Sequence, residues 1–143
     1  MKRMLMGMIL LSIMGMADFS RSDSGVVTDS VTGLQWQDDY SDNGDKEKAA
    51  NWEDAITYCE SLELDGGGWR LPNINELNSI IDLNRTSPAI DAIFQYTQSD
   101  DYWSSTTNIG YSYQAWSIYF GNGYRNVYDK SDSNYVRCVR SRL

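Results

Sequence analysis

Aromatic and small polar residues crowd the last third of the chain, where their types and spacing suit ligand binding. Tyr gives contact area at a low entropic cost, and Ser, Gly and Asn adapt their hydrogen bonds to a partner. Aromatic faces also stack on sugar rings, while Asn and Asp can hydrogen-bond hydroxyl groups. The residues that we expect to contact a ligand are Tyr111, Tyr113, Tyr119, Asn122, Tyr124, Arg125, Asn126 and Tyr128.

An alternative for each of these tyrosines is that it only packs on a sheet, because strands favour aromatic residues. For Trp103 and Trp116 we expect this structural role, in the core.

Groups that could perform catalysis are scarce. The 143-residue chain contains no histidine, so neither a Ser-His-Asp triad nor a Cys-His pair can form within it. A zinc site would need more Cys or His ligands than the two cysteines, Cys59 and Cys138, can supply. Carboxylate pairs that hydrolyse sugars remain an alternative, since Asp and Glu are plentiful. We expect a protein that is not an enzyme and that has no required cofactor.

One acidic segment, residues 38–47, has the composition of a calcium loop. Its spacing fits the first half of an EF-hand, but Ala50 stands where the bidentate Glu should be. The alternative is a solvated turn held by Asx hydrogen bonds. The candidate calcium ligands are Asp39, Ser41, Asn43, Asp45 and Glu47.

The first 17 residues have the pattern of a secretory signal peptide. A basic start at Lys2 and Arg3 precedes an apolar run, and small Gly15 and Ala17 precede a cut before Asp18. The apolar run of about 13 residues is shorter than the roughly 20 that span a bilayer. An uncleaved membrane anchor is the alternative. We therefore expect an exported chain, periplasmic or extracellular, with no membrane insertion after cleavage.

The mature chain, residues 18–143, is long enough for a single domain with one real core. Cleavage would change the formal charge from −8 to −10, because two of the 12 basic residues are lost and all 20 acidic residues stay. An acidic surface repels phosphate backbones, so we expect no nucleic-acid partner. Polyanions such as heparin are disfavoured too, unless the few arginines cluster.

Two helices should position the strands. Asn51 can cap a helix to about Leu62, on which Cys59 faces the core. Residues 66–68, three glycines, permit a sharp turn. Asn73 and Glu76 then have the spacing of a capping box. The second helix is expected to start at residue 74 and to end at residues 82–84. Its expected buried side consists of Ile74, Leu77, Ile80 and Ile81.

Two-residue periodicity indicates strands in the rest of the chain. Residues 121–123, Gly-Asn-Gly, form a hairpin turn between two of these strands. Residues 20–25 are expected to fray. The expected strands are residues 26–28, 34–37, 102–106, 115–120, 124–128 and 135–139, the last carrying Cys138. This order of elements predicts an α+β domain.

The two cysteines suggest one disulfide, because an even pair in an exported protein commonly forms one. It would close a loop of about 80 residues and add roughly 4.5 kcal/mol on the chain-entropy model. Two buried free thiols are the alternative.

Six short segments, in this order, resemble the C-terminal domain of the Legionella collagen-like adhesin family. Each segment alone is weak, and the resemblance rests on their order over most of the mature chain. The segments are residues 29–36, residues 52–55 with 58–59, residues 68–73 with 76–77, residues 102–106, residues 115–116 and residues 136–140.

The resemblance implies a C-type-lectin-like fold, with two helices packed on a twisted antiparallel sheet and the termini adjacent. It also implies a bridge from the first helix to the last strand, which Cys59 and Cys138 would supply. Members look like secreted or surface binding modules, some with glycan-adhesive roles. The namesake's collagen-like repeats are missing here, so its multivalent adhesion does not carry over.

Two further likenesses concern function. Residues 70–72, Arg-Leu-Pro, resemble a turn of formylglycine-generating enzymes, which share this fold and depend on an active-site cysteine pair. Because Cys59 and Cys138 look structural, we do not transfer that activity. Residues 111–135 are similar to the tails that diversity-generating retroelements vary.

We therefore expect an exported, non-enzymatic module that binds a glycan or a protein at the bacterial cell surface or in the periplasm. A structural domain that binds another protein in envelope assembly is the alternative. An enzyme acting on glycans is a third hypothesis.

Overall fold

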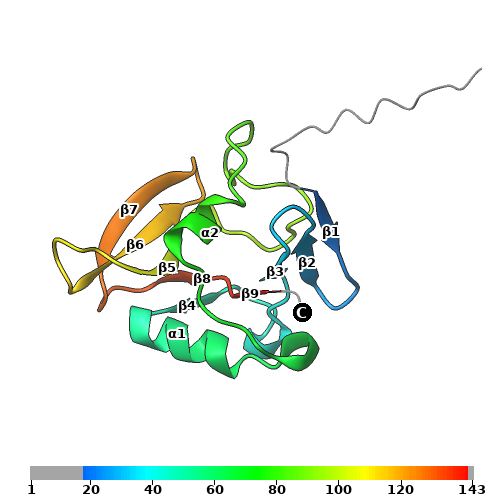
Figure 1. Ribbon diagram of the computed structural model, residues 1–143, viewed down its shortest axis with the longest axis horizontal. Helices are drawn as coiled ribbons and strands as arrows, with labels where there is room; N and C mark the ends of the chain where they lie inside the picture. Colours follow the sequence, from blue (N-terminus) through cyan, green and yellow to red (C-terminus); the bar gives the residue numbers. More distant parts are fainter. Residues whose placement is uncertain (1–17, 142–143) are drawn as a thin grey trace, which may run out of the picture.

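A computed structural model describes residues 18–141 as an α+β domain with two α-helices and two sheets (Figure 1). The predicted signal peptide lies outside the described residues. The elements in chain order are β1 (Phe19–Arg21), β2 (Val26–Asp29), β3 (Leu34–Gln37), β4 (Lys48–Ala50), α1 (Trp52–Ser61), α2 (Ile74–Asn78), β5 (Asp101–Thr107), β6 (Gln114–Tyr119), β7 (Tyr124–Asp129), β8 (Asn134–Val136) and β9 (Val139–Ser141). Short 3-10 helices span Ser41–Asn43 and Leu64–Gly66.

The strands form two sheets rather than the single antiparallel sheet that we expected. One has the order β1-β2-β3-β9 and the other β4-β8-β5-β6-β7. The pairs are antiparallel except β5 with β8, which is parallel. The first and last strands of the described chain are thus the two edges of one sheet.

Helix α1 forms where the sequence predicts it. The Asn51 side chain accepts a hydrogen bond from the Asp54 backbone N–H at 2.9 Å, which satisfies one free donor of the first turn. Ala55 and Cys59 on its inner side are fully buried. They pack with Trp103, on the five-stranded sheet.

Helix α2 begins as predicted but is shorter. Asn73 and Glu76 form the expected capping box, and Arg70 holds the Glu76 carboxylate with two bonds of 2.6 and 2.7 Å. The helix ends at Asn78, not at residues 82–84. The Ser79 hydroxyl bonds back to the Glu76 carbonyl, and Ile81 leaves the helix to form a β-bridge with Ile90.

Two short strands were missed by the sequence analysis, and one strand was predicted too long. Phe19–Arg21 pairs with β2, although residues 20–25 were expected to fray, and Lys48–Ala50 pairs with β8. The predicted strand over residues 135–139 is really β8 followed by β9, and the chain passes from one sheet to the other between them.

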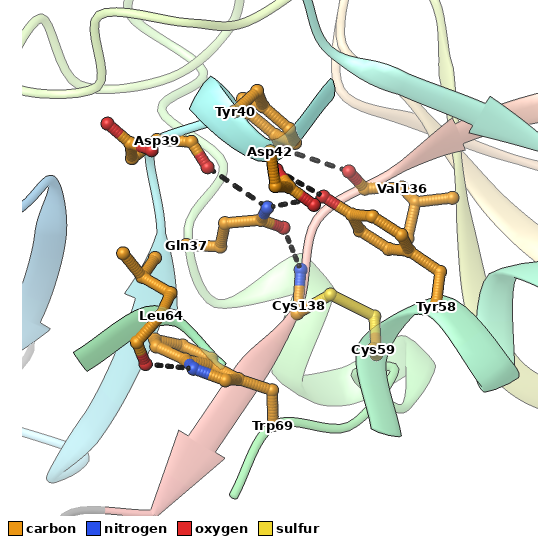
Figure 2. The surroundings of a disulfide bond; sticks show 10 residues. All are labelled: Gln37, Asp39, Tyr40, Asp42, Tyr58, Cys59, Leu64, Trp69, Val136 and Cys138. Carbon is orange, nitrogen blue, oxygen red and sulfur yellow. Dashed lines mark hydrogen bonds between the residues drawn. A yellow bond between two sulfur atoms is a disulfide. The ribbon is translucent and has the colours of Figure 1, made fainter. Parts of the chain in front are cut away.

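Cys138 lies at this passage, bonded to Cys59 of α1 with the two Cα atoms 5.4 Å apart (Figure 2). Gln37 bonds both backbone groups of Cys138. Its side-chain oxygen accepts from the Cys138 N–H at 3.2 Å, and its N–H donates to the Cys138 carbonyl at 2.9 Å. Cys138 therefore bonds to β3 of the four-stranded sheet and not to a strand of the five-stranded sheet. This change of partner interrupts the single strand that was predicted over residues 135–139.

Arg137, next to Cys138, is fully buried and forms an ion pair with buried Asp38 at 3.1 Å. Its guanidinium also donates to the Gln37 carbonyl and to the Thr97 hydroxyl. The other Asp38 oxygen accepts from Arg21 at 2.9 Å. One ion cluster therefore joins β1, the end of β3, the loop before β5 and the passage between the sheets.

Two apolar clusters fill the space around the five-stranded sheet. One lies under α2 and includes Tyr102 and Ile118, and the other lies under α1 and includes Trp103 and Ala115. The expected core positions of the tryptophans hold for Trp103, which is fully buried. Trp116 is partly buried and packs against the first cluster.

Replacing both cysteines, Cys59→Ala with Cys138→Ala, should lower the free energy of unfolding by about 4 kcal/mol, because 79 residues separate the bridged positions. Denaturant unfolding measures the change. The exposed substitution Val31→Ala serves as the control. A loss below ~1 kcal/mol would contradict the stabilising role.

Asp38→Asn should cost about 3 kcal/mol or more, because it leaves the buried Arg137 charge without a counterion. The same chemical change at exposed Asp23, Asp23→Asn, should be within ~0.5 kcal/mol of the wild type. Thermal and denaturant melting of the two variants tests this difference, and equal stabilities would refute it.

Candidate functional site

Polar side chains gather on one face of the five-stranded sheet, beyond the part that α1 covers. The register places residues of four adjacent strands on that face. We call this set the Asp101 face; its members are Asp101 of β5, Ser117 and Tyr119 of β6, Tyr124, Asn126 and Tyr128 of β7, and Asn134 of β8.

Asp101 is the centre of this face. It is only 5% exposed, and three side chains of β6 and β7 donate hydrogen bonds to its carboxylate. Ser117 and Asn126 bond one oxygen at 3.0 and 3.1 Å, and the Tyr128 hydroxyl bonds the other at 2.9 Å. Two predicted ligand-binding residues, Asn126 and Tyr128, are thereby held in fixed orientations.

The bond to Asp101, with burial as a smaller contribution, raises the pKa of Tyr128 from 10.0 to about 12. A phenolate next to the carboxylate would place two negative charges together, so the neutral phenol is favoured. Tyr128 is therefore a hydrogen-bond donor at physiological pH.

A cavity of about 200 Å³ adjoins Asp101. Asn134 lines it and is 9% exposed, and within residues 18–141 its amide nitrogen has no hydrogen-bond partner. The other lining residues are Ala49, Asp100, Asp101, Ser133 and Tyr135. An unpaired buried donor costs free energy. The nitrogen is buried beneath the lining, so the cavity borders Asn134 without exposing this donor.

Tyr119 and Tyr124 extend the Asp101 face to the hairpin turn. They are a directly opposed cross-strand pair, and Tyr124 is 68% exposed. Asn122, in the turn, accepts from the Tyr124 backbone N–H at 3.1 Å, so its side chain shapes the turn. The expected hairpin turn at residues 121–123 is confirmed by the bond from Gly123 N–H to the Tyr119 carbonyl.

Three predicted site residues lie away from the Asp101 face. Tyr111 and Tyr113, each 58% exposed, sit in the β5–β6 loop at the opposite end of the hairpin, with their rings 5.9 Å apart. Fully exposed Ile109 belongs to the same loop. Arg125 pairs with Ile118 and so occupies the other face of the sheet. The eight candidates therefore do not form one contiguous site.

The candidate calcium loop is held by its own hydrogen bonds. Asp39 accepts from both the backbone N–H and the hydroxyl of Ser41, in an Asx turn. Asn43 donates to the Lys46 carbonyl, and Glu47 accepts from Gln98. Asp45 is exposed, with a positive φ of 60°. Over the described chain, no three His, Cys, Asp or Glu side chains are grouped to hold a metal.

Arginines meet at one cavity, of about 540 Å³, beside residues 65–68. Arg140 donates to the carbonyls of Asp65 and Gly67, and Arg70 is paired with Glu76. Both charges are thus already engaged by the protein.

The buried floor of the Asp101 face is formed by three residues that were not predicted from the sequence: Asp101, Ser117 and Asn134. A signal was present for Ser117, because it alternates with partly buried Trp116 and buried Ile118 in the predicted strand. Asp101 is followed two residues later by Trp103, which points to the same face. An acidic residue at an inward position of a strand needs partners, and this requirement could have identified it.

Comparison with known families places this geometry in context. The sequence model of the Lcl C-terminal domain matches residues 25–140. The chain belongs to the Lcl C-terminal domain family. This confirms the resemblance to the collagen-like adhesin family, and an adhesin-like domain fits this membership. A comparison with curated proteins finds no match.

The family match covers β2 to β8, most of β9 and the whole Asp101 face, while β1 precedes it. No helix within residues 18–141 has the length and apolarity to cross a membrane.

Asp101→Asn should lower the pKa of Tyr128 from about 12 toward its ordinary value of 10.0, because the negative neighbour is removed. Ultraviolet titration of the variant and the wild type measures the shift, and Tyr128→Phe identifies the phenol concerned. In the wild type, the raised pKa contributes stability that is complete below pH 10 and lost as the pH rises toward 12. An unchanged titration in Asp101→Asn would contradict the assignment.

Proposed function

We propose that this domain is an exported, non-enzymatic binding module with a lectin-like fold, which recognises a glycan at the cell surface or in the periplasm. Membership of an adhesin-like family supports the surface location, and the Cys59–Cys138 disulfide is compatible with an oxidising compartment. The proposal includes no catalytic residue and no required cofactor.

The observation that carries this proposal is the hydrogen-bonded Asp101 face. Asn126 and Tyr128 are oriented by a buried carboxylate, so a ligand does not have to order them on binding. Exposed Tyr124 offers an aromatic surface beside them, and a cavity of about 200 Å³ adjoins Asp101. Stacking area next to fixed polar groups is what recognition of a hydroxyl-rich ring requires.

A second candidate is a domain that binds another protein in envelope assembly. The β5–β6 loop favours it, because Ile109, Tyr111 and Tyr113 expose apolar surface together. Aromatic residues are enriched at protein interfaces. This loop and Tyr124 of the Asp101 face lie at opposite ends of the β6–β7 hairpin, so variants at Tyr124 and in the loop can separate the two functions.

A glycan array with the mature chain tests the proposal. We expect sugar hits that Tyr124→Ala weakens by about tenfold or more, in line with the loss of an aromatic contact. Asn126→Ala should also weaken them, because it removes a hydrogen bond oriented by Asp101.

The matched control is Tyr111→Ala, which removes a tyrosine of similar exposure from the other end of the hairpin. Its glycan hits should equal those of the wild type. No sugar hits, together with capture of a protein partner that Tyr111→Ala abolishes, would favour the second candidate. Turnover of a glycan that is lost when one carboxylate is substituted would refute the hypothesis that the domain is not an enzyme.

A further inference from the structure

Strand β7 differs from the other edge strands of the two sheets. The edges formed by β1, β4 and β9 have three residues each, whereas β7 has six. β1 is pinned by the ion pair of Arg21, and β9 is bridged by Arg70. In Figure 1, β7 (orange) lies at the outer margin of the domain with β6 on its inner side. A long edge without proline or bulge is a ready template for another strand.

The direction of the backbone groups can be read from the two ends of the β6–β7 ladder. Gly123 N–H donates to the Tyr119 carbonyl at one end, and Lys130 N–H donates to the Tyr113 carbonyl at the other. Because opposed pairs alternate between bonded and non-bonded, the residues that turn their N–H and C=O groups away from β6 are Arg125, Val127 and Asp129.

These three residues are self-complementary when two β7 strands pair in antiparallel orientation. In an antiparallel pair centred on Val127, Val127 faces the partner's Val127, and Arg125 faces the partner's Asp129. A two-fold axis repeats this charge pair. Arg125 and Asp129 are exposed and Val127 is half-buried, so their side chains are accessible for these contacts.

We propose that two copies of this domain pair through their β7 strands in this register, forming one continuous ten-stranded sheet. The outward backbone groups of Arg125 and Val127 and the Asp129 N–H then bond to the partner. The Asp129 carbonyl, which already accepts from the Asp132 N–H at 2.9 Å, accepts a second bond. The local Arg–Asp pairs give the association its register, although the domain as a whole is acidic.

Pairing through β7 places the two Asp101 faces on the same side of the extended sheet. In the centred register, Asn126 lies beside the partner's Tyr128 on that side. Two copies would therefore present their faces together, and a repeating surface ligand would be bound with avidity. Only this consequence rests on the proposed function; the pairing itself does not.

Sedimentation of the mature, disulfide-bonded chain over a concentration series tests the pairing. We expect a monomer–dimer equilibrium. Arg125→Glu should raise its dissociation constant by about tenfold, because both charge pairs become repulsive. Asp129→Arg should do the same. The double variant, Arg125→Glu with Asp129→Arg, restores both pairs and should regain the wild-type constant.

The matched control is Arg85→Glu, the same charge reversal at an exposed position on the loop after α2, which should leave the constant unchanged. Circular dichroism and melting confirm that each variant is folded. A monomer at every concentration would overturn the proposal, as would a dimer insensitive to the single reversals or not restored in the double variant.

A second measurement uses the two-fold axis directly. Val127→Cys should form a covalent dimer in air, since a bonded antiparallel pair holds Cα atoms about 5.5 Å apart, within reach of a disulfide. Ser131→Cys, in the following turn, should remain monomeric. Equal cross-linking of the two variants would contradict this register.

Discussion

The buried ion pair between Arg137 and Asp38 secures the place where the chain leaves one sheet for the other. Arg137 has no exposed surface and neither does the Asp38 side chain, so each charge depends on the other and on fixed hydrogen bonds. Asp38 is also bonded by the backbone N–H groups of Gln95 and Tyr96. The loop before β5 is thereby tied to the last strands of the domain, far along the sequence.

Other hydrogen bonds also hold the chain in place where it passes between the two sheets. In Figure 2, the Gln37 side chain lies beside the disulfide; its amide donates to the Tyr58 hydroxyl and accepts from the Cys138 N–H. The Tyr40 hydroxyl donates to the Val136 carbonyl. Because β8 is fixed by these bonds, it can lie parallel to β5 and bring Asn134 beside Asp101. The floor of the Asp101 face thus depends on a junction at the other end of β8.

Local signals in the sequence predicted what local chemistry determines. The Asn51 cap, the capping box at Asn73 and the turn at residues 121–123 each follow from a few neighbouring residues, and each was predicted. The disulfide was also expected, because only one pairing of two cysteines is possible within the chain.

The features that were not predicted depend on contacts between residues that are distant in the sequence. Strands β1 and β4 have three residues each, too few for a periodic signal, and they exist because β2 and β8 offer them bonds. The break at Arg137 could not be read from a strand-like run. The candidate site followed the same rule: composition identified the tyrosines, but only the register showed that Tyr111 and Tyr113 lie apart from Tyr119 and Tyr124.

The electrostatics of the Asp101 face bear on what it can recognise. The domain is acidic, yet Asp101 does not project its charge outward, because it is buried and three donors surround its carboxylate. Its surface layer is made of neutral Tyr and Asn side chains. Binding there would rest on ring stacking and on hydrogen bonds to neutral groups, with little contribution from long-range attraction. A neutral, hydroxyl-rich ligand matches this layer better than an anionic one, which the overall charge of the domain would repel.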